Sequence, residues 1–126
     1  MINHGNQIEY WINTAKSDLD TAELLIRESR YIHGLFFCHL AIEKGLKAHV
    51  VKASGQIPPK SHNLIHLLDL SNIEFGGSNE NFLGILMKYQ LEGRYPDYNP
   101  VIPVKEKVFE YMNKTKEMLI WLERKL

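Results

Sequence analysis

Cysteine is almost absent from this chain of 126 residues, in which Cys38 is the only one. A single cysteine excludes an internal disulfide. Its neighbours in the sequence, Phe36, Phe37 and Leu40, are apolar, and no lysine or arginine stands beside it. A thiol in such surroundings is expected to be buried and unreactive, since reactive cysteines need an electropositive environment. We therefore do not expect Cys38 to act as a nucleophile.

The chain also lacks an excess of charge of either sign and a long apolar run. Its fifteen basic and fifteen acidic residues cancel, which removes the overall positive field that attracts nucleic acid or anionic membranes. No segment approaches the roughly twenty apolar residues that a membrane helix needs, and the first residues do not form a signal sequence. We expect a cytoplasmic protein with no membrane partner, in which any contact with nucleic acid is local.

Strand patterns and familiar catalytic motifs are missing as well. No segment alternates apolar and polar residues as a half-buried strand does. The glycine-containing loops lack the spacing of phosphate-binding and dinucleotide-binding loops, and there is no Gly-x-Ser-x-Gly elbow. The sequence therefore predicts no cofactor and no catalytic residue of a familiar type.

What is present is apolar periodicity typical of helices. Pro58 and Pro59 interrupt it after the second segment, Ser78 or Asn79 can cap the fourth, and Pro103 suits the first turn of the fifth. The length is that of one domain. We predict that residues 1–126 form a single all-α domain, an up-and-down antiparallel bundle of four to five helices, three of them long. The periodic segments are 8–26, 31–52, 63–70, 82–89 and 104–122.

Asp18 is the first residue that does not suit a simple bundle. It lies between Ala15 and Ala22 at spacings of three and four, on or beside the apolar side of the first helix. Burying a carboxylate without a partner would be costly. Either Asp18 lies at the solvated edge of the apolar side, or a cation or backbone donor meets it inside the fold.

A polar ridge interrupts the central segment, where His39, Glu43 and Lys47 follow one another at intervals of four, with Lys44 beside them. On an exposed ridge, Glu43 and Lys47 would form a weak ion pair and nothing more. If the ridge faces a cleft or a second subunit, His39 can titrate near neutral pH and Lys44 or Lys47 can bind a phosphate. The sequence leaves both interpretations open.

His62 and His66 are also four residues apart, a spacing that can place two imidazoles on one metal ion. A zinc site needs a third ligand, and no acid or cysteine stands at a matching distance. We therefore predict no metal site. His62 is expected instead to be a polar residue that orders the start of the third helix.

The stretch "LEGRYPDYNP", residues 91–100, breaks the helical pattern. Gly93 is expected to end the fourth helix, and Pro96 keeps Tyr95 out of helical geometry. Arg94 would then be presented next to a turn, where its guanidinium can bind a phosphate or a carboxylate while Tyr95 or Tyr98 offers a ring for stacking. In the alternative, which is compatible with the first, Arg94 pairs with an acid of the bundle, either Asp18 or Glu43.

Four motifs in order resemble the HEPN domain family, and together they cover nearly the whole chain. They are "HLAIEKGLKA" (39–48), "PKSHNLIHLL" (59–68), "GRYPD" (93–97) and, in the first helix, Trp11, Ala15, Asp18, Leu19 and Ala22. The resemblance implies a four- or five-helix up-and-down bundle that usually forms a homodimer. It also implies that Asp18, His39, Glu43, Lys47, Arg94 and Tyr95 line a shared cleft, with Lys44 beside them as a further binding residue. Leu40 departs from the family, which commonly has Gln there.

The resemblance implies two kinds of function. Many members act with a minimal nucleotidyltransferase as a two-component or toxin–antitoxin pair and have been proposed to bind nucleotides. Others are metal-independent ribonucleases with an Arg followed, after four to six residues, by a His. Arg94 can match the Arg, but Asn99, Pro100 and Val101 occupy the positions of the His. Because acid–base cleavage needs a group that carries a proton near neutral pH, the ribonuclease role is not expected unless another histidine has taken it over.

We therefore expect a homodimeric binding and regulatory protein that engages a nucleotide, an RNA end or a nucleotidyltransferase partner through Arg94 and the polar ridge. A ribonuclease toxin whose acid–base groups have moved to His39 or His62 is one alternative. The other is a helical oligomerisation partner without a ligand, in which Arg94 and Asp18 form a structural pair.

Overall fold

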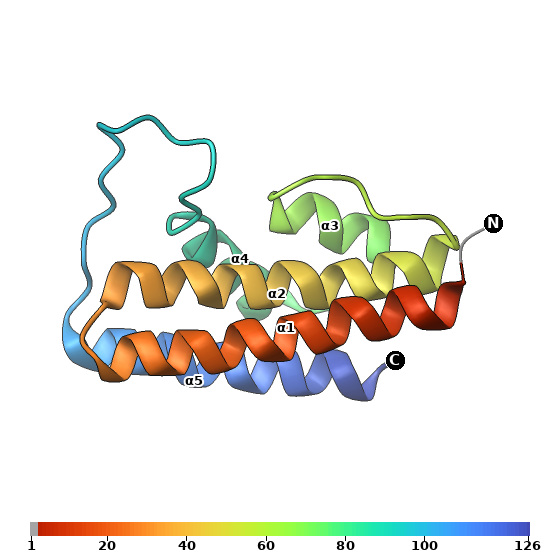
Figure 1. Cartoon of the computed structure of the whole chain (residues 1–126), viewed down its shortest axis with the longest axis horizontal. Helices are drawn as coiled ribbons and strands as arrows, with labels where there is room; N and C mark the ends of the chain where they lie inside the picture. The colour runs from red at the N-terminus through yellow and green to blue at the C-terminus, as the bar shows by residue number, and fades with distance from the viewer. Residues whose placement is uncertain (1–2) are drawn as a thin grey trace.

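The computed structural model describes residues 3–126 and contains five α-helices in this range, without a strand. Three are long and two are short, as predicted, and the fold is all-α. Figure 1 shows α1, α2 and α5 lying lengthwise beside one another, with α3 and α4 on the remaining side of α2. The helices are α1 (His4–Arg27), α2 (Tyr31–Ser54), α3 (Leu64–Ser71), α4 (Gly77–Met87) and α5 (Lys105–Arg124).

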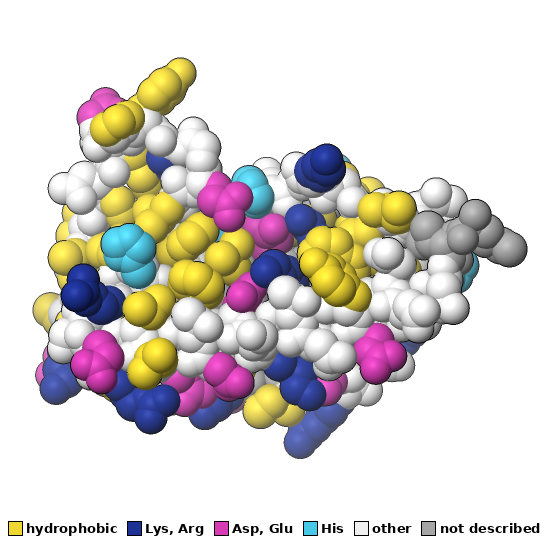
Figure 2. All heavy atoms as spheres, viewed as in Figure 1, with side chains coloured by type: hydrophobic (Ala, Val, Ile, Leu, Met, Phe, Trp, Pro, Cys, Tyr) yellow, Lys and Arg dark blue, Asp and Glu magenta, His cyan; other side chains and the backbone are white. Residues whose placement is uncertain are grey.

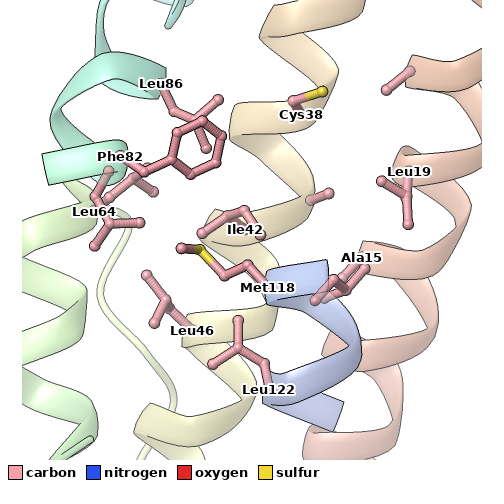
Figure 3. Close-up of a cluster of buried hydrophobic side chains, with 14 of the residues drawn as sticks. Ala15, Leu19, Cys38, Ile42, Leu46, Leu64, Phe82, Leu86, Met118 and Leu122 are labelled. Atoms are coloured by element: carbon pink, nitrogen blue, oxygen red, sulfur yellow. The ribbon is translucent and has the colours of Figure 1, made fainter. Parts of the chain in front are cut away.

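The central helix is α2, which contacts all four of the others. Its side chains are buried around most of its circumference, as expected for a helix that is apolar on nearly every side. Figure 3 shows Ile42 and Leu46 of α2 meeting Phe82 of α4 and Leu122 of α5 in the core. The core therefore extends along both flanks of α2.

Small residues bring α1 close to α2. Ala15 and Ala22 of α1 are fully buried. Near the connection between the two helices, a Cβ on Gly34 would lie 2.5 Å from Cγ1 of Ile26. A side chain larger than hydrogen at residue 34 would thus force the two helices apart.

The thiol of Cys38 lies in this core, with its Sγ 3.7 Å from Sδ of Met112. Burial is the main cause that raises the pKa of Cys38 to about 12. The prediction of a buried thiol is confirmed. At neutral pH the sulfur is protonated and has little nucleophilic character.

Two predicted helix starts are wrong in detail. The cap of α4 is Gly76, and Asn79 donates instead to the carbonyl oxygen of Phe75 over 2.9 Å. The cap of α5 is Val104 in an extended conformation, so Pro103 lies before the helix and not in its first turn. A glycine with φ of +82° at residue 76 redirects the chain before either polar candidate for the α4 cap is reached.

The end of α4 also differs from the prediction. The helix stops at Met87, whereas we expected it to continue to Gly93. Lys88 and Tyr89 donate to carbonyl oxygens three residues back, over 3.1 and 2.9 Å, which tightens the chain into turns. A longer irregular segment follows, and Figure 1 shows it standing out from one end of the bundle.

Within residues 3–126, no helix combines the length and apolar character needed to cross a membrane.

Candidate functional site

The polar ridge of α2 is built around the carboxylate of Glu43. Oε2 of Glu43 accepts a hydrogen bond from Nζ of Lys47 over 3.1 Å, and Oε1 accepts one from Nδ1 of His62 over 3.0 Å. Glu43 and Lys47 are both buried. The interpretation of this pair as an exposed ridge is therefore wrong, because residues 55–63 fold back along α2 and bring His62 over it (Figure 1).

His39 lies one turn before Glu43 and is fully buried. Its Nε2 donates to the carbonyl oxygen of His62 over 3.1 Å. Its Nδ1 is 3.7 Å from Oε1 of Glu43 and has no hydrogen-bond partner among the described residues. Burial is the main cause that lowers the pKa of His39 to about 4. The charges of Lys47 and Arg94 act in the same direction, and the bond to His62 opposes the shift. The expectation that His39 titrates near neutral pH is wrong, because the protein holds the ring neutral.

His62 connects this buried cluster with the segment that carries Arg94. Besides its bond to Glu43, the ring places Nε2 at 3.3 Å from Oε2 of Glu92, and 42% of the side chain is exposed. His62 does not cap α3. Asn63 does so, by accepting a hydrogen bond from the amide of His66 over 3.1 Å. His62 therefore contributes to the site rather than to the start of the helix.

Asp18 meets a cation inside the fold, which is one of the two outcomes left open by the sequence. Its Oδ2 is 2.7 Å from Nζ of Lys44, and both side chains are largely buried. The contact is an ion pair whose geometry does not suit a hydrogen bond, because Oδ2 has no hydrogen-bond partner within residues 3–126. The predicted pairing of Arg94 with Asp18 or Glu43 is not observed, since these acids contact Lys44, Lys47 and His62.

Arg94 is exposed, yet its side chain is held in place. Its Nε donates to the carbonyl oxygen of Gln90 over 3.1 Å, and the guanidinium carbon lies 4.1 Å from the ring centroid of Tyr98. Gly93, with φ of +75°, supplies the turn just before it. No carboxylate within residues 3–126 lies within 4.0 Å of this guanidinium. The charge of Arg94 is the smallest of several causes that shift the pKa of His39.

Tyr95 is 82% exposed, and Tyr98 is the tyrosine that stacks on Arg94. The rigid backbone around Pro96 thus presents Tyr95 to solvent, where it is available to a ligand but is not held against the cluster. Of the two tyrosines proposed for stacking, the structure brings only Tyr98 onto the guanidinium.

Two residues near the cluster were not recognised from the sequence as parts of a site. Trp11 of α1 lies beneath Lys47, whose Nζ is 5.3 Å from the ring centroid. Glu92 contacts His62, as described above. From the sequence, Trp11 was an apolar helix position and part of the family motif, with no indication of a contact to Lys47. Glu92 had no signal of its own, because its role depends on how the irregular segment folds back.

Figure 2 shows how these charged and apolar side chains are distributed on the face formed by α1 and α2. Histidine, acidic and basic side chains gather near the middle of α2, and hydrophobic side chains lie on either side of them. No group of three or more His, Cys, Asp or Glu side chains in the described part of the chain is arranged to hold a metal ion. The surface therefore combines a charged centre with apolar flanks.

Comparisons with known proteins agree with this architecture. A family model described as the HEPN domain matches residues 8–125. A crystal structure of TT1696 from Thermus thermophilus is similar, with a TM-score of 0.79 and 24% identity over 96% of this chain and 99% of the other. A crystal structure of ST0689, an archaeal HEPN homologue, has a TM-score of 0.63 and 19% identity over 94% of this chain and 96% of the other. No curated protein matches. At these identities the structural likenesses show the fold alone.

Proposed function

Because this chain belongs to the HEPN domain family, we propose that it is a cytoplasmic, homodimeric binding and regulatory protein that holds the phosphate of a nucleotide or an RNA end on Arg94. The observation that carries this proposal is the state of the Arg94 guanidinium. It is exposed, stacked on Tyr98 and not neutralised by a carboxylate of the described residues.

The geometry of Arg94 suits recognition of a phosphate. Of the five N–H groups of a guanidinium, the one on Nε is used by the carbonyl of Gln90, which leaves those on the two terminal nitrogens free. A planar fork of this kind binds two oxygens of a phosphate at once. Stacking on Tyr98 holds the fork in one orientation, so less side-chain entropy is lost on binding.

The lysines of the ridge have a supporting role in this proposal. Lys44 is neutralised by Asp18, and Lys47 by Glu43, so neither is free to bind a phosphate without breaking an ion pair. Lys44 keeps part of its side chain exposed and is the second cation that a ligand on this face could reach. The buried pairs instead fix α1 and residues 55–63 against α2. Asp18, His39, Glu43 and Lys47 thus support the site, while Arg94, Tyr95, Tyr98 and Lys44 offer the accessible groups.

Calorimetric titration tests the proposal directly. We expect ATP, or a short RNA with a 5′-phosphate, to bind the wild-type protein. Arg94→Ala should weaken binding about tenfold or more, because one charge-assisted contact contributes roughly 1.5–3 kcal/mol. Arg124→Ala, which removes another exposed arginine at the far end of α5, is the matched control and should bind as the wild type does. Equal binding by the wild type and Arg94→Ala, or binding by neither, contradicts the proposal.

The homodimer is supported by the family and by apolar surface on α2. Figure 2 shows hydrophobic side chains gathered over the N-terminal half of this helix. Phe36 is only half-buried and packs edge-on against Phe37, with ring centroids 5.8 Å apart. A second copy of the chain that covers this surface would remove it from water.

We expect sedimentation velocity to show a dimer for the wild type and a monomer for Phe36→Asp, because a carboxylate in an apolar interface loses its hydration without gaining a partner. The control is Phe109→Asp, a phenylalanine on the exposed side of α5, which should remain dimeric. A wild-type monomer at concentrations of about 100 μM would count against the dimer, since it would place the dissociation constant well above that range.

Family membership is also what supports a nucleotidyltransferase as partner. In this proposal the chain is one half of a two-component or toxin–antitoxin pair, and its charged face receives the second protein or that protein's nucleotide. Co-purification of the two proteins from a cell that expresses both would test this part. Failure of the pair to associate, with or without nucleotide, would contradict it.

A ribonuclease is the second candidate function, and one observation favours it. His62 has a part-exposed imidazole and contacts Glu92, two residues before Arg94. His39, with a pKa of about 4, is poorly suited to shuttle protons at neutral pH. RNA cleavage by the purified protein that survives a chelator and disappears in His62→Ala would favour this function over simple binding. Activity that disappears only in His39→Ala would assign the role to the buried ring instead.

A further inference from the structure

A cavity of about 480 Å³ lies away from the Arg94 segment, at the end of the bundle where α2 and α5 finish. Figure 1 shows these helix ends beside the C-terminus, with the irregular segment 91–104 at the opposite end. The groups that matter for its chemistry are His49 and Lys52 of α2, Ile73 and Glu74 after α3, and Trp121 and Lys125 at the end of α5.

Two ammonium groups line this cavity without a carboxylate partner. Nζ of Lys52 donates to the carbonyl oxygen of Lys125 over 2.7 Å, and Nζ of Lys125 lies 5.4 Å from the ring centroid of Trp121. Neither is within 4.0 Å of a carboxylate of the described residues, although Glu74 stands on the same wall. The cavity therefore holds two positive charges against one negative charge.

The protein itself already uses two carbonyl groups at the end of α5, and these uncharged acceptors stabilise an ammonium group without cancelling its charge. His49 donates from Nε2 to the carbonyl oxygen of Leu122 over 2.7 Å, and Lys52 uses that of Lys125. Mainly through burial, the pKa of His49 is lowered. The His49 ring is thus neutral at neutral pH and offers Nδ1 as an acceptor rather than adding a third cation.

Part of the remaining wall is flat and apolar, and Ser71 and Asn72 add polar groups to it. Trp121 is half-buried, and its ring packs edge-on against Phe75 with centroids 5.3 Å apart, so that its plane is fixed. Ile73 adds an aliphatic surface. A fixed indole beside two ammonium groups favours a planar ring that carries a negative charge. The volume is within the range of pockets that bind small molecules.

We propose that this cavity binds a small aromatic anion, with its ring against Trp121 and its carboxylate or phosphate between Lys52 and Lys125. The site is separate from Arg94 and does not depend on the function proposed for that residue. The carboxylate of Glu74 would exclude ligands whose charge extends to that wall.

Tryptophan fluorescence provides the test, since Trp11 and Trp121 are the two tryptophans of the chain. In a Trp11→Phe protein, the remaining signal reports on Trp121 alone. The probes are phenyl phosphate and benzoate, which distinguish the two anionic groups, and benzylamine, which has a similar ring with the opposite charge. We expect one or both anions to change the fluorescence in a saturable way, and benzylamine to leave it unchanged.

Charge variants show whether the lysines are responsible. Lys52→Met and Lys125→Met remove an ammonium group and keep most of the aliphatic stem, and both residues are exposed, so the fold should persist. Each variant should weaken binding of the anion about tenfold. Lys105→Met, at the first residue of α5, is the matched control and should have no effect. Arg94→Ala should also leave this binding intact, which separates the cavity from the other site. Absence of saturable binding by either anion, equal binding of benzylamine, or unchanged affinity in both lysine variants would overturn the proposal.

Discussion

Glu43 is the residue that joins Lys47 and His62 in the polar cluster inside the bundle. Its two carboxylate oxygens bind Lys47 of the same helix and His62 of the following segment. A buried ion pair of this kind adds little stability compared with apolar side chains of the same size. What it provides is a fixed connection between α2 and the chain that leads to Glu92 and Arg94.

We expect Glu43→Leu to lower the free energy of unfolding by about 3–5 kcal/mol, because it leaves the ammonium group of Lys47 buried without a partner. The double variant Glu43→Leu with Lys47→Met should recover much of this loss, since no charge is then stranded. Urea unfolding followed by circular dichroism measures all of these. If the double variant were as unstable as the sum of the two single variants, Glu43 and Lys47 would not be coupled as described.

At the scale of single residues, the sequence singled out several polar side chains that the structure brings together, but it predicted few of their partners. The sequence left open whether Asp18 lies at a solvated edge or meets a cation or backbone donor, and the structure places it beside the ammonium group of Lys44. The choice of Lys44 over Arg94 depends on how α1 is rotated against α2, which no local pattern specifies. His62 could not be connected with Glu43 in advance, because the contact requires residues 55–63 to fold back along α2.

At the scale of helices, the end of a helix was predicted correctly where the apolar periodicity stops at a turn-forming residue. The end of α2 at Ser54 is followed by Gly55 with φ of +68° and then by the proline pair, and it was predicted closely. The end of α4 was missed because no glycine or proline follows Met87 until residue 93. There the helix ends without a local glycine or proline, and Tyr89 just beyond it is buried.

Glycines allow a test of helix packing with a matched control. Gly34→Ala adds a methyl group 2.5 Å from Cγ1 of Ile26. It should destabilise the protein by about 1–3 kcal/mol despite the better helix propensity of alanine. Gly84 of α4 has nothing within 4 Å of an added Cβ. Gly84→Ala should therefore stabilise the protein by about 0.5–1 kcal/mol. Thermal unfolding of the two variants should give shifts of opposite sign, and a stabilising Gly34→Ala would show that α1 and α2 are less tightly packed than described.

On the scale of the whole molecule, α2 carries two different surfaces. The charged face with Glu43 and Arg94 lies on one part of the bundle, and the cavity beside Trp121 lies at the end where α5 finishes. Each contains a buried histidine in its neutral form, His39 in the polar cluster and His49 in the wall of the cavity. This makes the stability of the entire fold dependent on pH.

Burial lowers the pKa of His39 from 6.5 to about 4 and shifts that of His49 in the same direction. Between pH 6.5 and about 4, His39 is protonated in the unfolded chain but not in the folded one, so the unfolded chain binds more protons. The contribution of neutral His39 to the free energy of unfolding is therefore fully present above about pH 6.5. It is lost as the pH decreases toward 4, which lowers the free energy of unfolding by about 3 kcal/mol. Urea unfolding between pH 7 and 4.5 measures the slope.

The variant His39→Gln should be less stable at pH 7 and should show a shallower fall in stability toward acid. The control is His33→Gln, which replaces an exposed histidine of the same helix and should retain the wild-type slope. A His39→Gln slope identical to that of the wild type would mean that His39 is not the group responsible.

The central claim is that the guanidinium of Arg94 is the group that receives the ligand's phosphate. NMR observation of the arginine Nε–H signals during titration with ATP tests it most directly, because the chain has only four arginines. We predict that the Arg94 signal, identified by its loss in Arg94→Lys, shifts and saturates at the affinity found by calorimetry, while those of Arg27, Arg30 and Arg124 stay in place. If ATP binds and the Arg94 signal does not move, the claim is wrong.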